Sequence, residues 1–248
     1  MHLYTPPKVI LCLHISYHSI NNTNQINIST ASAILAAAAG CKVAKCGNRS
    51  VSSACGSADV LEMIGVAIDL PPVKAAECIN TCGVGFLYAP INHPAMKAVA
   101  PIRKAMGIRT TFNIIGPITN AAGANRVVIG VFEERLVELL AHTLVELGTI
   151  EHGVVIHGCG LDEISPIGGS TICEIRNTAT KGAMKVYYLY PLYTLYTLHT
   201  LCTLYKVYDV KTFFFDPLTV GVPRCVVEDL KGGSPTQNVE VRVCGTRP

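Results

Sequence analysis

A short segment rich in hydroxyls, glycines and cations has the composition of a phosphate-binding loop. It reads Lys45-Cys46-Gly47-Asn48-Arg49-Ser50-Val51-Ser52-Ser53 and is followed, after Ala54, by Cys55-Gly56-Ser57-Ala58-Asp59. Backbone N–H groups, hydroxyls and a lysine near the start of a helix are donors that bind phosphate. A solvated serine-rich loop has a similar composition, so this segment alone leaves both interpretations open.

Two adjacent carboxylates, Asp162 and Glu163, follow a run of residues that predicts a buried strand over Val154–His157. Adjacent acids repel each other unless a cation lies between them, and their hard oxygen atoms suit magnesium. Acidic pairs are also common in solvated loops. The pair is therefore a candidate metal site that needs support from the rest of the chain.

A third candidate is Arg103, in the run Ala100-Pro101-Ile102-Arg103-Lys104, together with the apolar segment Thr111–Pro117. An arginine beside an apolar pocket bounded by Gly116 and Pro117 could hold a small carboxylate through two parallel hydrogen bonds. The alternative is an arginine on the surface of a helix.

No serine–histidine–aspartate or cysteine–histidine pattern accompanies these candidates, so nucleophilic catalysis is not expected. His93 stands before Pro94 at an expected helix start, and His157 ends a predicted strand. Both histidines are interpreted as structural.

The elements that must position these residues alternate between strands and helices. An Asn27–Thr30 cap and an alanine run predict a helix that ends at Gly40, and leucines at 136, 139, 140, 144 and 147 predict an amphipathic helix. Strand–helix–strand units of about thirty residues indicate an α/β fold, with a mainly parallel sheet flanked by helices. Ligands bind at the carboxyl ends of such strands, where residues 45–53 and 158–165 would lie. Further elements are expected at 42–45 (strand), 60–64 (helix), 94–106 (helix) and 127–132 (strand).

Composition agrees with a folded domain. The chain has 248 residues, is 50% hydrophobic and carries a net charge of +3, which excludes a disordered chain, a nucleic-acid-binding tail and a small disulfide scaffold. Its 11 cysteines include no CxxC pair, so reduced thiols in an intracellular or organellar compartment are expected. No apolar run reaches the roughly 18 residues that span a bilayer, and no membrane partner is expected.

Near the C-terminus, the segment from Tyr187 to Tyr208 is of low complexity, with Thr-Leu repeated every three residues. A period of three suits neither a helix nor a strand face. We interpret residues 186–210 approximately as an insertion in the domain.

Together, the three candidates and their flanking motifs resemble the anthranilate phosphoribosyltransferase family. The resemblance runs from Asn27 to about Glu174 and again from Phe215 to Asn238. Its motifs are NIST at 27–30, K-x-GNRSVSS at 45–53, CGSADVLE at 55–62, HPAMK at 93–97, RTTFNIIGPITN at 109–120, GLDEIS at 160–165 and DLKGG at 229–233.

The resemblance implies the catalytic domain of the nucleoside phosphorylase/phosphoribosyltransferase fold. It also implies transfer of a phosphoribosyl group from phosphoribosyl pyrophosphate (PRPP) to anthranilate in tryptophan biosynthesis, with Mg²⁺ as cofactor. Lys45, Asn48 and Arg103 match the positions that carry catalysis. The metal positions are Ser29, Asp162 and Glu163. The PRPP positions are Asn27, Ser29, Thr30, Lys45, Gly47, Asn48, Arg49, Ser50, Ser52, Ser53 and Ser57, and the anthranilate positions are Cys46, Asn48, Arg103, Gly116 and Pro117.

The chain departs from the family pattern at three points. Residues before Asn27 contain no GTGGDG loop and no helical N-terminal subdomain, and Cys46 replaces the histidine of KHGNR. We therefore expect residues 1–25 to be a non-family segment and residues 26–248 to form the α/β domain. The family's homodimer uses the helical subdomain, so it is not carried over to this chain.

Three functions remain open: the phosphoribosyltransferase itself, an impaired or catalytically dead member that keeps the fold, and a pyrimidine nucleoside phosphorylase-like enzyme. The expected partners are the small molecules PRPP and anthranilate, with no nucleic acid. The expected location is the cytoplasm, or the plastid stroma if the protein comes from a plant.

Overall fold

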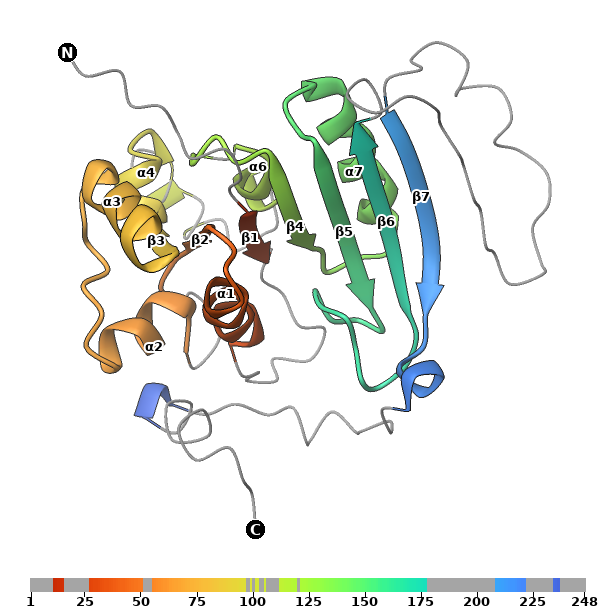
Figure 1. Cartoon of the computed structure of the whole chain (residues 1–248), viewed down its shortest axis with the longest axis horizontal. Helices are drawn as coiled ribbons and strands as arrows, with labels where there is room; N and C mark the ends of the chain where they lie inside the picture. Colours follow the sequence, from red (N-terminus) through yellow and green to blue (C-terminus); the bar gives the residue numbers. More distant parts are fainter. Residues whose placement is uncertain are drawn as a thin grey trace.

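A seven-stranded sheet organises the molecule, with strand order β3-β2-β1-β4-β5-β6-β7 (Figure 1). The first five strands in this order are parallel, and β6 and β7 are antiparallel additions. This confirms the expected α/β fold with a mainly parallel sheet. The strands are β1 (Leu11–Ile15), β2 (Val43–Gly47), β3 (Val84–Tyr88), β4 (Arg126–Gly130), β5 (His152–Gly158), β6 (Ser170–Asn177) and β7 (Tyr208–Phe215).

This computed structural model describes residues 11–15, 27–50, 55–96, 99, 101–102, 105, 112–119, 121–177, 208–221 and 234–236. Of the helix expected at 94–106, residues 97, 98, 100, 103, 104 and 106 lie outside these residues. Residues 96, 99, 101, 102 and 105 are helical, and residues 94 and 95 form a turn. Within them, the helices are α1 (Ile28–Ala38), α2 (Ser57–Met63), α3 (Pro72–Cys82), α4 (Ala89–Asn92), α6 (Phe112–Ile118), α7 (Arg135–Leu147) and the 3₁₀ helix η1 (Pro217–Val220). No helix of this described part is long and apolar enough to cross a membrane.

Helices cover both faces of the sheet. On one face, Ala33 of α1 packs with Val43 of β2 and Val128 of β4. On the other face, Val127 and Ile129 of β4 join the core that contains α3 and α7. Because successive strand residues point to opposite faces, these contacts tell us which side of the sheet each strand residue faces.

The amphipathic helix α7 shows how sequence spacing becomes packing. Leu136, Leu140 and Leu144 are buried against the sheet, as the periodicity predicts. Leu139 and Leu147, which were expected on the same apolar face, are instead 55% and 49% exposed. At 100° per residue Leu139 lies outside the stripe formed by Leu136, Leu140 and Leu144. Leu147 lies within the stripe, but it is the last residue of the helix. The helix ends at Gly148, which adopts a left-handed φ of 67°.

The central strand β1 was not anticipated. Residues 11–15 pair in parallel with both β2 and β4, so the sheet includes part of the segment that we expected to lie outside the domain. The family boundary near residue 25 stays a prediction, but the sheet itself begins at Leu11. Five residues with one polar member give too weak a pattern for a confident strand assignment from the sequence.

Strands β6 and β7 form a fully paired antiparallel ladder. Asn177 pairs with Tyr208 at one end and Ser170 pairs with Phe215 at the other. The last residues of the expected insertion, 208–210, therefore belong to β7. Residues 178–207, which contain the rest of it, lie outside the described residues.

This pairing predicts that residues 179–206 can be replaced by a short turn. Antiparallel strands need only a two- to five-residue connection, and Asn177 already lies opposite Tyr208. The shortened protein should keep its thermal midpoint within about 4 °C, equivalent to roughly 1 kcal/mol, by circular dichroism. A control deletion that extends through residue 210 removes three paired residues of β7 and should unfold at a lower temperature. Equal loss in both proteins would contradict the insertion interpretation.

Candidate functional site

The acidic pair lies in a tight loop directly after β5. Gly158 and Leu161 exchange two backbone hydrogen bonds of 2.9 Å each, and Asp162 and Glu163 follow this turn. The loop then folds back over the ends of β4 and β5. A Cβ at Gly130 would lie 1.7 Å from the carbonyl oxygen of Asp162, and one at Gly158 would lie 2.2 Å from that of Glu163. Glycine is therefore required at both strand ends for the loop to approach.

Both carboxyl groups are withdrawn from water. Asp162 is only 6% exposed, and Glu163 Oε2 is buried with no hydrogen bond to any residue that the structure describes. Burial raises the pKa of Asp162 to about 7. Burial, together with the charge of Asp162, raises the pKa of Glu163 to about 8. The charge of Lys45 acts in the opposite direction on both groups.

Lys45 reaches this region from β2. It is 3% exposed, and its Nζ donates to the carbonyl of Cys46 at 3.0 Å. In the sheet, Lys45 lies on the same face as Val43, and Gly130 lies on the same face as Val128; both valines pack with α1. Lys45 and the acidic loop therefore share the α1 face of the sheet, at the carboxyl ends of its strands.

The start of α1 faces the same edge. Since β1 and β2 are adjacent and parallel, the helix that connects them must run antiparallel to both, with its N-terminus at their carboxyl ends. Ser29 and Thr30 in its first turn are buried. Asn27 precedes the helix and its Nδ2 donates to the carbonyl of Cys55 at 3.1 Å. The helix N-terminus thus adds the partial positive charge of its first turn to the site.

The loop after β2 is held by Asp59 of α2. Asp59 Oδ2 accepts from the backbone N–H groups of Ser50 at 2.9 Å and Gly56 at 2.8 Å. The carbonyl of Asn48 accepts from Ala58 N at 3.2 Å, and a Cβ at Gly56 would lie 2.4 Å from Ser50 N. The loop and the first turn of α2 therefore form one packed unit. The Gly-x-x-Asp spacing of a capping box could have identified Asp59 from the sequence.

Arg49 is engaged with carboxylates of α2. Its guanidinium binds Glu62 through two hydrogen bonds of 2.7 and 2.8 Å and Asp59 through one of 3.1 Å. These bonds, with Glu62 contributing most, raise the pKa of Arg49 and lower that of Glu62. In this arrangement Arg49 links the loop after β2 to helix α2. Its role as a PRPP contact stays a prediction.

The structure thus brings most of the predicted PRPP and metal positions to the carboxyl ends of the parallel strands. Cys46 differs, because it is buried in the core on the face that carries α3 and α7. Asn48 is exposed, Ser57 opens α2, and Gly116 and Pro117 belong to α6. Ser52, Ser53 and Arg103 lie outside the residues whose side chains are described, so their assignments, like the anthranilate contact of Cys46, stay predictions.

The residues present suit magnesium rather than a metal held wholly by protein. Among the described residues, no three His, Cys, Asp or Glu side chains gather as metal ligands. Mg²⁺ is usually bound through one or two carboxylates together with substrate phosphates. The buried Oε2 of Glu163, next to Asp162, is an oxygen donor of this kind.

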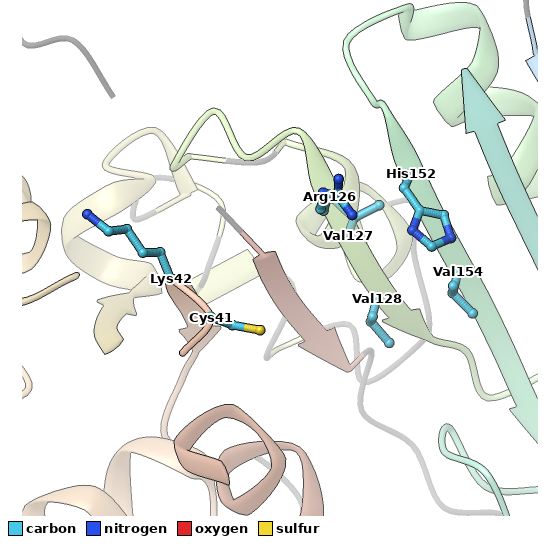
Figure 2. A pocket seen from close by; sticks show the side chains of 7 residues that line it. All are labelled: Cys41, Lys42, Arg126, Val127, Val128, His152 and Val154. Atoms are coloured by element: carbon cyan, nitrogen blue, oxygen red, sulfur yellow. The ribbon is translucent and has the colours of Figure 1, made fainter. Parts of the chain in front are cut away.

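A separate hollow lies at the opposite ends of the strands, their amino ends (Figure 2). It has a volume of about 250 Å³ and is lined by Cys41, Lys42, Arg126, Val127, Val128, His152 and Val154. His152 contacts Glu174 at 2.7 Å, and Lys42 donates to Asn80 at 3.2 Å. Figure 2 shows Lys42 directed away from Arg126 and His152. The hollow is lined at the amino ends of β2, β4 and β5. It is therefore separate from the site formed by Lys45, Asp162 and Glu163 at the carboxyl ends, which we call the acid–lysine site.

The sheet and the acid–lysine site define an α/β domain whose polar groups converge at the carboxyl ends of parallel strands, which is where sheets of this kind bind ligands. A family model described as the α/β domain of the glycosyl transferase family matches residues 21–192. The chain belongs to this family.

Individual relatives agree. The anthranilate phosphoribosyltransferases of Methanosarcina acetivorans and Acetivibrio thermocellus are 42% and 44% identical over 221 and 222 residues, each match covering 89% of this chain but only 51% and 55% of the relative. The crystal structure of the Thermus thermophilus enzyme has a TM-score of 0.74 and 36% identity, covering 95% of this chain and 60% of that one. The Saccharomyces cerevisiae enzyme in complex with PRPP and Mg has a TM-score of 0.72 and 25% identity, with coverage of 95% and 56%. This chain spans about half the length of the curated relatives it matches.

The close approach at Gly130 predicts that Gly130→Ala displaces the acidic loop. The added Cβ would meet backbone rather than a movable side chain, so the free energy of unfolding should fall by about 1–3 kcal/mol in urea denaturation. Gly153→Ala is the matched control, since its Cβ would lie 3.3 Å from side-chain atoms of Ile175 and Val127. A loss no greater than that of the control would contradict the packing described here.

The hydrogen bonds of Asp59 predict that Asp59→Ala lowers the free energy of unfolding by about 1–2 kcal/mol, because two backbone N–H groups lose their acceptor. Glu62→Ala removes only the exposed ion pair with Arg49 and should cost less. Urea denaturation followed by circular dichroism measures both. If Glu62→Ala cost as much as Asp59→Ala, the loop would depend on the ion pair instead.

Proposed function

We propose that this chain is the α/β domain of an anthranilate phosphoribosyltransferase, which transfers the phosphoribosyl group of PRPP to the amino group of anthranilate and releases pyrophosphate. The observation that carries this proposal is the buried Lys45 close to the buried Asp162–Glu163 pair, at the edge where α1 begins. A polyanionic substrate and a divalent cation together complement this set of charges.

Asp162 and Glu163 would hold Mg²⁺, with the hydroxyl of Ser29 as a further oxygen donor. When bound, Mg²⁺ neutralises charge on the pyrophosphate as it leaves the sugar. The burial that raises the pKa of both acids also excludes water that would screen them. A cation at this site would restore the ionised form of both groups.

Lys45 and the first turn of α1 would stabilise the leaving group. Negative charge develops on the pyrophosphate as its bond to the anomeric carbon breaks, while the sugar becomes oxocarbenium-like. A buried ammonium group and the positive end of a helix act most strongly on such charge in a site that excludes water. Lys45 is 3% exposed, so it is already desolvated before the reaction.

Anthranilate needs little activation, because an aromatic amine is already a nucleophile. Positioning beside the anomeric carbon therefore supplies much of the rate. Asn48 and Arg103 are the proposed contacts for the substrate, with Gly116 and Pro117 of α6 at the apolar side. Arg103 would bind the carboxylate of anthranilate through two parallel hydrogen bonds.

A second candidate is a family member that keeps the fold and binds ligand but transfers slowly or not at all. The observation that favours it is the connection between β1 and α1, residues 16–26, which contains no glycine. The family resemblance places its glycine-rich GTGGDG loop here, and a loop without glycine lets the backbone approach a pyrophosphate less closely.

Consumption of anthranilate, followed by its fluorescence with PRPP and Mg²⁺, tests the proposal. We expect transfer by the native chain and a loss of at least about 100-fold in Asp162→Asn/Glu163→Gln, since charge stabilisation of the leaving group is removed. Glu133→Gln/Glu134→Gln is the matched control, because it neutralises another adjacent acidic pair, which contacts Arg135 and Thr171.

The outcomes separate the candidates. No consumption by folded protein that still binds PRPP with Mg²⁺ in calorimetry would support the impaired member. Phosphorolysis of thymidine by the native chain would support a nucleoside phosphorylase-like enzyme. Equal activity of the two double variants would exclude Asp162 and Glu163 as metal ligands.

A further inference from the structure

His157, the penultimate residue of β5, joins two backbone groups from different parts of the chain. Its Nδ1 lies 2.9 Å from the carbonyl oxygen of Val131, which follows β4, and its Nε2 lies 3.2 Å from the N–H of Gly160. A carbonyl can only accept and an N–H can only donate. The two partners therefore define a neutral ring that carries its proton on Nδ1 and accepts at Nε2.

The turn that His157 contacts is conformationally costly. Cys159 has a φ of 53°, the one positive φ among the described non-glycine residues, and Gly160 has a φ of 85°. With the paired bonds between Gly158 and Leu161, these angles correspond to a two-residue turn with both central residues left-handed. A non-glycine residue in this region carries strain, because its Cβ crowds the following carbonyl oxygen. The bond from Gly160 to the imidazole is one contact that offsets it.

This turn determines where the acidic pair lies. Asp162 directly follows Leu161, and its carbonyl sits against Gly130 at the end of β4. Val131, the acceptor of the His157 proton, is the next residue after Gly130. The imidazole therefore ties the turn to the same strand end on which the Asp162 backbone packs.

We propose that His157 is a positioning residue, whose neutral imidazole fixes the turn 158–161 to the end of β4 and so holds Asp162 and Glu163 in place to bind a divalent cation with the pyrophosphate of PRPP. The inference rests on the proposed function for its ligand. His157 does not need to touch the substrate or the metal, because its two ring nitrogens are already occupied by Val131 and Gly160.

Two amide variants separate the two hydrogen bonds. In His157→Asn the amide lies near the position of Nδ1 and can replace the bond to Val131, but it is too short to reach Gly160. In His157→Gln the amide reaches the position of Nε2, where its oxygen can accept from Gly160. His142→Asn, at an exposed position of α7, is the matched control.

The measurement is Mn²⁺ binding in the presence of PRPP, by electron paramagnetic resonance of the full chain. Outer-shell partners of metal ligands typically contribute about 10- to 100-fold in metal affinity. We expect His157→Asn to weaken Mn²⁺ binding by about 10-fold or more and His157→Gln by clearly less. His142→Asn should bind as the native chain does. Where transfer is measurable, the KM for PRPP should rise while the KM for anthranilate stays unchanged.

A rescue variant distinguishes positioning from general loss of stability. Cys159→Gly removes the strain of the left-handed residue, so it should restore part of the Mn²⁺ affinity lost in His157→Asn while changing the native chain little. Thermal unfolding of each variant shows whether it is folded. The proposal is overturned if His157→Asn binds Mn²⁺ as tightly as the native chain, or if its loss is not reduced by Cys159→Gly.

Failure of the proposed function would give a different result. In that case the native chain itself would bind no Mn²⁺ with PRPP. Nitrogen NMR of the imidazole still tests the two hydrogen bonds of His157 to Val131 and Gly160. A protonated Nδ1 and an unprotonated Nε2 support them, and the reverse tautomer contradicts them.

Discussion

The burial of one lysine and two carboxyl groups at the carboxyl edge of the sheet is the constraint on which the site depends. Buried charges are costly unless they are paired. Here the positive charge of Lys45 attracts the carboxylates of both Asp162 and Glu163. When all three groups are ionised, the carboxylates outnumber the lysine. Burial raises the pKa of both acids in the protein alone, and the charge of Asp162 adds to this effect at Glu163. The excess negative charge is of the sign that a divalent cation would neutralise.

Backbone packing makes this arrangement possible. The acidic loop approaches the sheet only because Gly130 and Gly158 lack side chains, and its turn is held by His157. On the other side of the site, Asp59 binds the loop after β2 to the start of α2. The acidic pair is thus carried by a short loop whose position is determined by close contacts at strand ends, and Lys45 stands on β2 itself. Functional groups on loops that a rigid scaffold positions are typical of binding sites.

Sequence reasoning succeeded where local signals were strong. The cap and alanine run predicted α1, and leucine spacing predicted α7, although Leu139 and Leu147 proved to be exposed. It missed β1, whose five residues carry no clear periodicity, and α3, for which Pro72 at the first turn and the left-handed Gly83 at the end were available signals. It also could not anticipate that Arg49 would bind Glu62 or that Cys46 would enter the core.

By itself, the sequence determined the chemistry available to this protein: a lysine in a glycine- and serine-rich segment, an adjacent acidic pair after an apolar strand, and the strand–helix units of a parallel sheet. Local propensity and residue type are sufficient for these features. Only the tertiary structure decided that Lys45 and the acidic pair share one face of the sheet and that Cys46 faces the other. That choice depends on strand order and on the alternation of side chains across the sheet, which follow from long-range pairing rather than from neighbouring residues.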